Sequence, residues 1–211
     1  MKTTLLFLLS TLLFVGCYHE GNIEYLADLR KVPKNFINHF PKKIADSMSV
    51  NLIMNKDTSS GCIYYMLFEY EKNDIKKPFL DSINNRSISK FQSSDTNIIS
   101  VKRETVTYWH PEKNRTYKNL VFGDKFYYPV PYFEKHSSLE YRGNVNDIYS
   151  DTTTSGLSQD FMIYVFDYKP GIYWKGLRPL NYMPTECKNG YSKGIALNEK
   201  KKIIIYWFII W

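Results

Sequence analysis

The sequence predicts an α+β fold: a single domain with a mostly antiparallel sheet, short N-terminal helices and a C-terminal β-hairpin. Three observations predict it. Apolar runs of strand length alternate with turn-rich stretches, aromatic residues make up 17% of the 211 residues, and the chain closes on an uninterrupted apolar run at 203–211. Aromatic side chains favour strands, and this length suits one domain. We expect about five to seven strands.

The N-terminal part of this domain is expected to be helical. A short helix is expected at 23–29, and the apolar residues between 36 and 48 follow helical spacing. Pro41 lies inside that stretch, so it predicts two short helical turns with a break between them.

The middle of the chain alternates between strand-like and loop-like stretches. Residues 61–70 are apolar at successive positions, which predicts a strand buried on both faces and therefore central in the sheet. Apolar spacing predicts a helix at 75–89, weakened at Pro78, and strands at 98–109 and 161–168. Prolines predict an edge or loop at 123–133, and turn residues predict a long loop at 137–159.

The C-terminal hairpin is the clearest prediction. Its strands are expected at 192–197 and 202–211, joined by a turn at 198–201. The last strand is apolar at successive positions and therefore on both of its faces, so we expect it in the middle of the sheet.

The first residues have the features of a targeting segment. Lys2 is followed by an apolar run at 5–15, which is shorter than the ~20 residues that a membrane-spanning helix needs. A short apolar run behind a positive charge is typical of a secretory signal peptide.

The end of this run, Leu13-Phe14-Val15-Gly16-Cys17, resembles the lipobox of bacterial lipoproteins, although Phe14 stands where Leu is usual. The resemblance implies cleavage before Cys17 and acyl chains, such as palmitate, on that residue. It divides the chain into a signal peptide at 1–16, a tether at 17–31 and one globular domain at 32–211. The alternative is an ordinary secretory leader in which the cysteine is incidental.

The residues after the cysteine favour the outer membrane, with the domain facing the periplasm. Tyr18 stands where an aspartate would resemble an inner-membrane retention signal, and Glu20 and Glu24 are too scattered to resemble a surface-export signal. The segment 190–196 with the strand containing Tyr206 and Trp207 is similar to the C-terminal hairpin of small uncharacterised lipoproteins of Bacteroides-type bacteria. That group implies no activity.

Two other cysteines are present in the mature chain. Cys62 and Cys187 form a candidate disulfide in an oxidising periplasm. The alternative is that Cys62, which begins an apolar run, is a small buried hydrophobic residue.

The search for chemistry favours a protein that is not an enzyme. The four histidines lack the spacing of a zinc site, and we expect neither a metal nor a cofactor. Removing Lys2 from a chain of net charge +7 leaves +6, with the basic residues spread out. This pattern, in an exported protein, does not favour nucleic-acid binding.

Two aromatic pairs are the best candidates for a recognition patch. They are Trp109-His110 and Tyr173-Trp174, since aromatic faces stack on sugar rings or on peptide side chains. Core packing is the alternative fate of these residues. The sequence therefore favours a lipid-anchored envelope protein that binds an envelope protein or a glycan without catalysis. The alternative is an envelope hydrolase that acts on cell wall or glycan.

Overall fold

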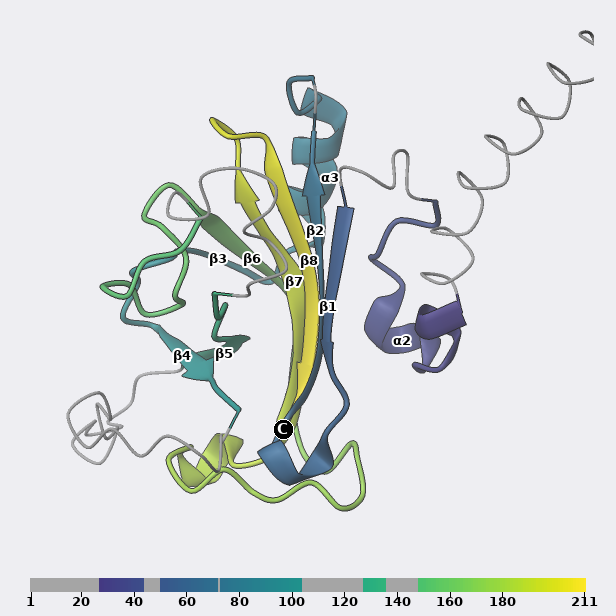
Figure 1. Ribbon diagram of the computed structural model, residues 1–211. Coiled ribbons are helices and arrows are strands. Elements are labelled where there is room, and N and C mark those ends of the chain that lie inside the picture. Colours follow the sequence, from purple (N-terminus) through teal and green to yellow (C-terminus); the bar gives the residue numbers. More distant parts are fainter. Residues whose placement is uncertain (1–26, 44–49, 72, 104–126, 136–147) are drawn as a thin grey trace, which may run out of the picture.

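A computed structural model describes residues 27–43, 50–71, 73–103, 127–135 and 148–211. Within these ranges the chain forms short helices and mostly antiparallel strands (Figure 1). The elements in chain order are α2 (Lys34–Ile37), β1 (Val50–Asn55), η2 (Thr58–Ser60), β2 (Ile63–Tyr70), α3 (Lys77–Arg86), β3 (Ser89–Gln92), β4 (Ile98–Val101), β5 (Tyr128–Pro131), β6 (Met162–Pro170), η6 (Thr185–Cys187), β7 (Gly190–Asn198) and β8 (Ile203–Ile210).

Six strands form the main sheet in the order β1-β2-β8-β7-β6-β3, and every neighbouring pair is antiparallel. The predicted α+β class and C-terminal hairpin are confirmed: β7 and β8 pair along their whole length, from Tyr191 opposite Ile210 to Asn198 opposite Ile203. The final strand lies in the middle of the sheet, between β2 and β7, as its two apolar faces predict.

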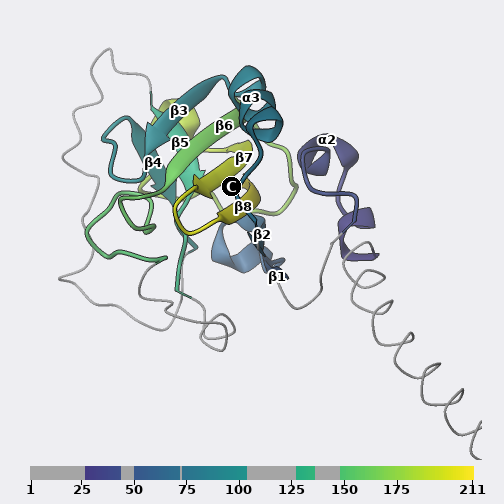
Figure 2. The ribbon, with the colours of Figure 1, turned by 90° about the horizontal axis from the view of Figure 1, so that it is seen from above.

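The sheet is buried on both faces, which explains why its central strands are apolar throughout. Along β8, Trp207 and Ile209 belong to one core cluster, whereas Phe208 and Ile210 belong to the other. The alternation follows from the pleat, which points successive side chains to opposite sides. Figure 2 shows α2 and α3 on one side of the sheet, and β4 and β5 on the other.

We call the first side the helix-covered face. It is packed by apolar residues of the N-terminal segment and of α3, namely Leu29, Val32, Phe36, Phe40 and Ile83. The other side, the loop-covered face, is packed by the two-stranded parallel sheet β4-β5, by residues 148–161 and by part of the β6–β7 connection.

Several sequence-based expectations differ from the structure at their boundaries. Pro78 occupies the first turn of α3, where its missing N–H costs no hydrogen bond, so it begins the helix instead of weakening it. The helix ends at Arg86, and the following residues pair with β6 as β3. Strand β1 was not predicted. Residues 123–133 are expected as an edge or loop; within them β5, with two prolines, pairs with β4 in the part of the chain that the structure describes.

The folded domain also begins earlier than residue 32. Residues 27–30 are helical, and the side chain of Leu29 is buried on the helix-covered face. The end of the expected tether is therefore part of the domain. Leu29 is a buried apolar residue within residues 17–31, the stretch that is expected to be a polar tether.

Candidate functional site

The β6–β7 connection carries the largest exposed apolar side chains among the described residues. We call residues 171–176 the aromatic loop. Ile172 is 78% exposed, Tyr173 38% and Trp174 37%. Such side chains usually lie inside, so three in succession at the surface distinguish this loop. It runs along the end of the sheet where the C-terminus lies (Figure 1).

Only half of the predicted recognition patch falls within the described residues. Tyr173 and Trp174 are exposed there, and Trp109 and His110 lie outside the described residues. Ile172, the most exposed of the three, was not singled out from the sequence. The signal that could have found it is its position beside Gly171 in a turn-rich connection.

Aromatic contacts hold Tyr173 against the folded domain. Its ring meets that of Tyr191 edge to face at 4.6 Å and that of Phe36 at 6.3 Å. Phe36 and Tyr191 are themselves 4.9 Å apart in the same geometry. Edge-to-face pairs at these separations are attractive. One side of Tyr173 is therefore fixed by β7 and by the N-terminal segment, while its remaining surface faces solvent.

A buried polar cluster lies beneath this contact, and we call it the latch cluster. Lys193, on β7, is 8% exposed. Its Nζ donates to the backbone carbonyl of Asn35 and, at 3.3 Å, to Oδ1 of Asn38. Asp167 Oδ2 lies 4.0 Å from the same Nζ and accepts a hydrogen bond of 2.6 Å from the Tyr191 hydroxyl. The cluster joins the N-terminal segment to two strands of the sheet.

A bulge in β6 makes this pairing possible. The register shifts between Val165 and Asp167, after which Asp167 stands opposite Lys193. A bulge adds one residue to one strand and redirects its side chains. Asp167 consequently points to the helix-covered face, where Lys193 needs a counter-charge.

Burial governs the electrostatics of the latch cluster. Desolvation lowers the pKa of Lys193, and the nearby carboxylate of Asp167 opposes that change. Burial also raises the pKa of Tyr191, and the hydrogen bond to Asp167 raises it further. Because a buried charge is costly without partners, the carbonyl, amide and carboxylate oxygens around Nζ stabilise the ammonium in place.

His39 is a second buried polar residue in the N-terminal segment. Its Nε2 lies 3.0 Å from the carbonyl oxygen of Trp207, and because a carbonyl only accepts, Nε2 carries the proton. Burial lowers the pKa of His39 to about 3, and the cations Lys193 and Arg86 contribute to the decrease. The imidazole is therefore neutral at pH 7, and it connects the N-terminal segment to β8.

The cysteines are buried thiols. The structure contains Cys62 and Cys187 as thiols and not as a disulfide, so the predicted bridge is not formed in it. Both belong to the core cluster of the loop-covered face, and for Cys62 this position agrees with the alternative of a small buried hydrophobic residue. Burial, with Glu186 nearby, raises the pKa of Cys187 to about 11. A thiol with such a pKa is a poor nucleophile at neutral pH.

In the ranges that the structure describes, no group of three His, Cys, Asp or Glu side chains is placed to hold a metal ion. Within the same ranges, no helix has the length and apolar character to cross a membrane. Comparisons of the chain with protein-family models, with curated proteins and with solved structures give no match.

Proposed function

We propose that this chain is a lipid-anchored protein of the bacterial cell envelope that acts as a non-catalytic binding module. The leader at 1–16 and the lipobox-like residues that end at Cys17 support the anchor. We place the protein in the outer membrane, with the domain facing the periplasm. The anchor is what the resemblance to bacterial lipoproteins implies, and the candidate binding surface is the aromatic loop.

The single observation that carries the binding role is the exposure of Ile172, Tyr173 and Trp174 in succession. Apolar surface that a folded protein leaves exposed commonly marks an interaction site. Three classes of partner fit two aromatic rings beside an aliphatic side chain: an apolar patch of another envelope protein, a sugar ring, and the interface of a lipid bilayer.

The buried polar groups of the latch cluster, and His39, are engaged in contacts within the fold. An envelope hydrolase would need an acid or base that faces its substrate. Lys193 and Asp167 instead bond the N-terminal segment and Tyr191, and His39 is engaged with the Trp207 carbonyl. These groups hold the fold together.

The anchor is tested by the Cys17→Ala variant. We expect wild-type protein to incorporate labelled palmitate and to stay with membranes after a high-salt wash. The variant should incorporate no label, although the uncut leader can still hold it on membranes. If the variant takes up label, or if the wild type takes up none, the anchor is wrong.

The binding surface is tested with purified cell envelopes and the mature chain carrying Cys17→Ser, which removes the lipid. We expect the Tyr173→Ala/Trp174→Ala double variant to bind at least tenfold more weakly than its parent, with unchanged circular dichroism. The matched control is Ile88→Ala, because Ile88 is 53% exposed and lies outside the loop. Equal binding by the parent and a folded double variant would exclude the loop as the binding surface.

A further inference from the structure

We propose that the partner of the aromatic loop is the bilayer itself: Ile172, Tyr173 and Trp174 insert into the headgroup layer of an anionic membrane, and basic side chains around them contact its phosphates. The proposal rests on the proposed function, because it assigns the partner of the same surface. It also gives the domain a fixed orientation on the membrane that carries its lipid anchor.

The side chains of the loop have the chemistry of a membrane interface. Trp and Tyr are enriched at that depth, because their rings are apolar while their N–H and O–H groups remain hydrated. Ile172 adds a purely apolar side chain that is 78% exposed. A sugar platform would use the two rings and gain little from this isoleucine, whereas the acyl boundary of a bilayer would bury it.

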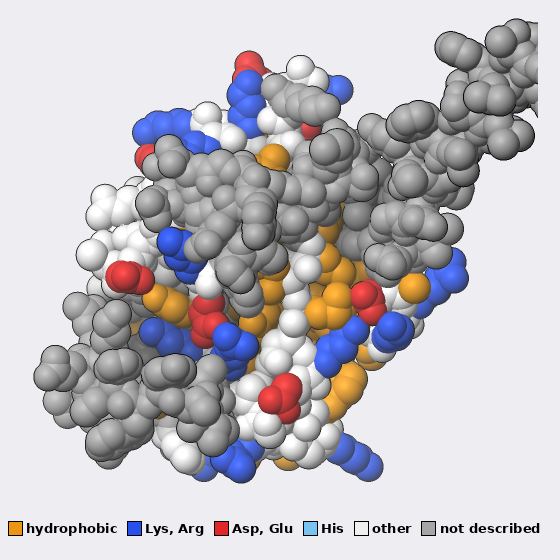
Figure 3. Space-filling view, viewed as in Figure 1, with side chains coloured by type: hydrophobic (Ala, Val, Ile, Leu, Met, Phe, Trp, Pro, Cys, Tyr) orange, Lys and Arg blue, Asp and Glu red, His pale blue; other side chains and the backbone are white. Residues whose placement is uncertain are grey.

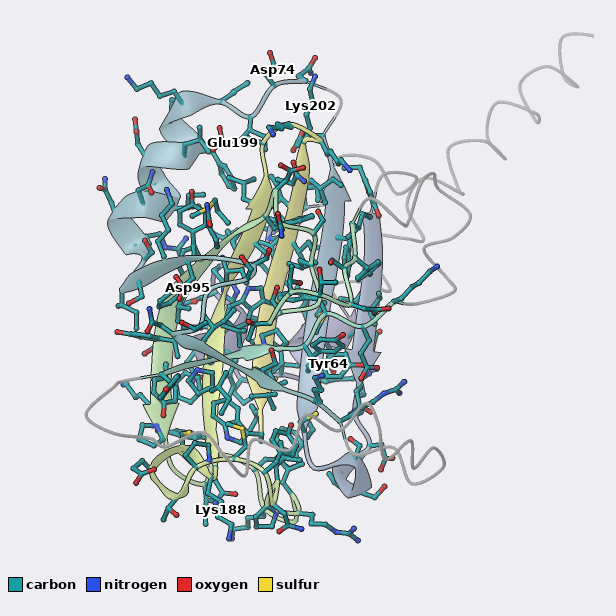
Figure 4. The ribbon with its side chains drawn as sticks, turned by 90° about the vertical axis from the view of Figure 1, so that its left-hand side faces the viewer. Tyr64, Asp74, Asp95, Lys188, Glu199 and Lys202 are labelled. Atoms are coloured by element: carbon teal, nitrogen blue, oxygen red, sulfur yellow. The ribbon has the colours of Figure 1, made fainter. Side chains whose placement is uncertain are left out.

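The two segments that meet at Tyr173 carry a net positive charge. Residues 27–43 contain five basic residues against one acidic residue, and residues 167–190 contain four against two. Together they carry a net charge of +6, while the whole chain carries +7. The contact between Phe36 and Tyr173 joins the segments. Figure 3 shows basic side chains projecting at the lower end of the molecule, and Lys188 lies at that end in Figure 4.

An anionic surface complements this charge. Basic side chains close to a membrane of anionic lipids are attracted to it over roughly a Debye length. At the opposite end of the molecule Asp74 and Glu199 lie near Lys202, whose Nζ is ion-paired with Asp74 (Figure 4). The exposed apolar side chains of the aromatic loop, together with the net positive charge of the two segments, therefore favour an approach with the loop toward the membrane.

The anchor position keeps this face close to the membrane. Nine residues lie between Cys17 and Ala27, and the ten steps of a fully extended chain span at most about 35 Å. The folded segment that follows Ala27 is fixed to the sheet by the latch cluster, and it reaches Tyr173 through Phe36. A lipid on Cys17 would thus hold the loop near the bilayer, where its effective concentration is high.

The test uses the mature chain with Cys17→Ser, so that any binding is independent of the lipid. Its sedimentation with vesicles of phosphatidylcholine alone is compared with that of vesicles that also contain phosphatidylglycerol. We expect at least tenfold stronger binding to the anionic vesicles, weakened at high salt. Ile172→Ser should reduce this binding severalfold, and the Ile172→Ser/Tyr173→Ala/Trp174→Ala variant at least tenfold. Ile88→Ser is the matched control and should bind like its parent.

Fluorescence reports whether the loop itself inserts. Of the four tryptophans, Trp207 and Trp211 are buried, at 0% and 1% exposure, Trp174 is partly exposed, and Trp109 lies outside the described residues. We expect anionic vesicles to shift the tryptophan emission of the parent to shorter wavelength, and Trp174→Phe to remove most of that shift. Because Ile172 contacts solvent over most of its surface, Ile172→Ser should fold even if the triple variant does not.

The outcomes separate this proposal from the proposed function. Failure of the parent to bind anionic vesicles, or equal binding by the parent and Ile172→Ser, overturns membrane docking. If the Tyr173→Ala/Trp174→Ala variant still loses its binding to envelopes in that case, the loop recognises an envelope protein or glycan and the proposed function stands. Failure of the wild type to take up labelled palmitate would overturn the anchor alone.

Discussion

His39 should make the folded protein sensitive to mild acid. Its pKa is about 3 in the folded protein, compared with about 6.5 for an exposed histidine. Between these values the unfolded chain binds a proton that the folded chain does not. The stability that His39 contributes is therefore fully present above about pH 6.5 and is lost progressively as the pH falls toward 3.

The magnitude follows from the difference between the two pKa values. Each pH unit inside this window costs about 1.4 kcal/mol, so lowering the pH from 7 to 4.5 should reduce the free energy of unfolding by about 2.5 kcal/mol through His39. His39→Gln keeps an N–H donor for the Trp207 carbonyl but does not titrate. The wild type should consequently lose about 2.5 kcal/mol more than this variant over the same change.

The assay is urea unfolding of both proteins at pH 7 and pH 4.5, followed by circular dichroism. Comparing the two proteins cancels the carboxylates, such as Asp28 and Asp57, whose pKa values are lowered in the folded state. Lys200→Gln is the control, because it changes an exposed cation elsewhere. If the wild type and His39→Gln lose the same stability between the two pH values, the neutral buried imidazole is refuted.

Two further predictions concern the core. Gly194→Ala should destabilise the fold by about 3 kcal/mol or more, because the added Cβ would overlap the backbone oxygen of Tyr164 and lie 2.8 Å from the Trp207 ring. Thermal unfolding measures the loss of stability, and an unchanged Tm would contradict the prediction. Cys62 and Cys187 should resist a thiol reagent in the native protein at pH 7, and both should react with it after denaturation without reductant. If neither cysteine reacts in the denatured protein, the two form a disulfide.

The apolar pattern was sufficient to predict the centre of the fold. In β2 and β8 every position is apolar or aromatic over most of the length, so both faces must be covered, and only an interior strand meets that condition. The Asn198–Lys201 stretch supplied the turn. The hairpin could be predicted from the sequence because the residues that define it are neighbours along the chain.

The edges and the polar cluster could not be predicted in the same way. Strand β1 (Val50–Asn55) has asparagines among its apolar residues and becomes a strand because β2 pairs with it. Lys193 is the only charged side chain in β7, and this isolation was the one available signal. Its partners Asn35 and Asp167 are far away in sequence, and neither the spacing nor the composition indicates that they meet.

Lys193 links the N-terminal segment to the strands beside the aromatic loop, which leads to a last prediction. An ammonium on an interior strand requires oxygen partners, and the N-terminal segment supplies one of them through Asn35. The same segment carries Phe36, which supports Tyr173. The latch cluster therefore orients the loop relative to the N-terminal segment, whereas the proposed anchor at Cys17 would limit only its distance from the membrane.

Lys193→Met should separate these two contributions. Methionine fills a similar volume without the ammonium, and the loss of charged hydrogen bonds should destabilise the protein by about 2 kcal/mol. We expect the lipidated variant to remain anchored, because Cys17 is unchanged, while its Cys17→Ser form binds anionic vesicles severalfold more weakly than the parent. Lys200→Gln removes the same charge from an exposed site and should weaken that binding less. Equal losses in the two folded variants would mean that net charge, and not the orientation of the loop by Lys193, determines docking.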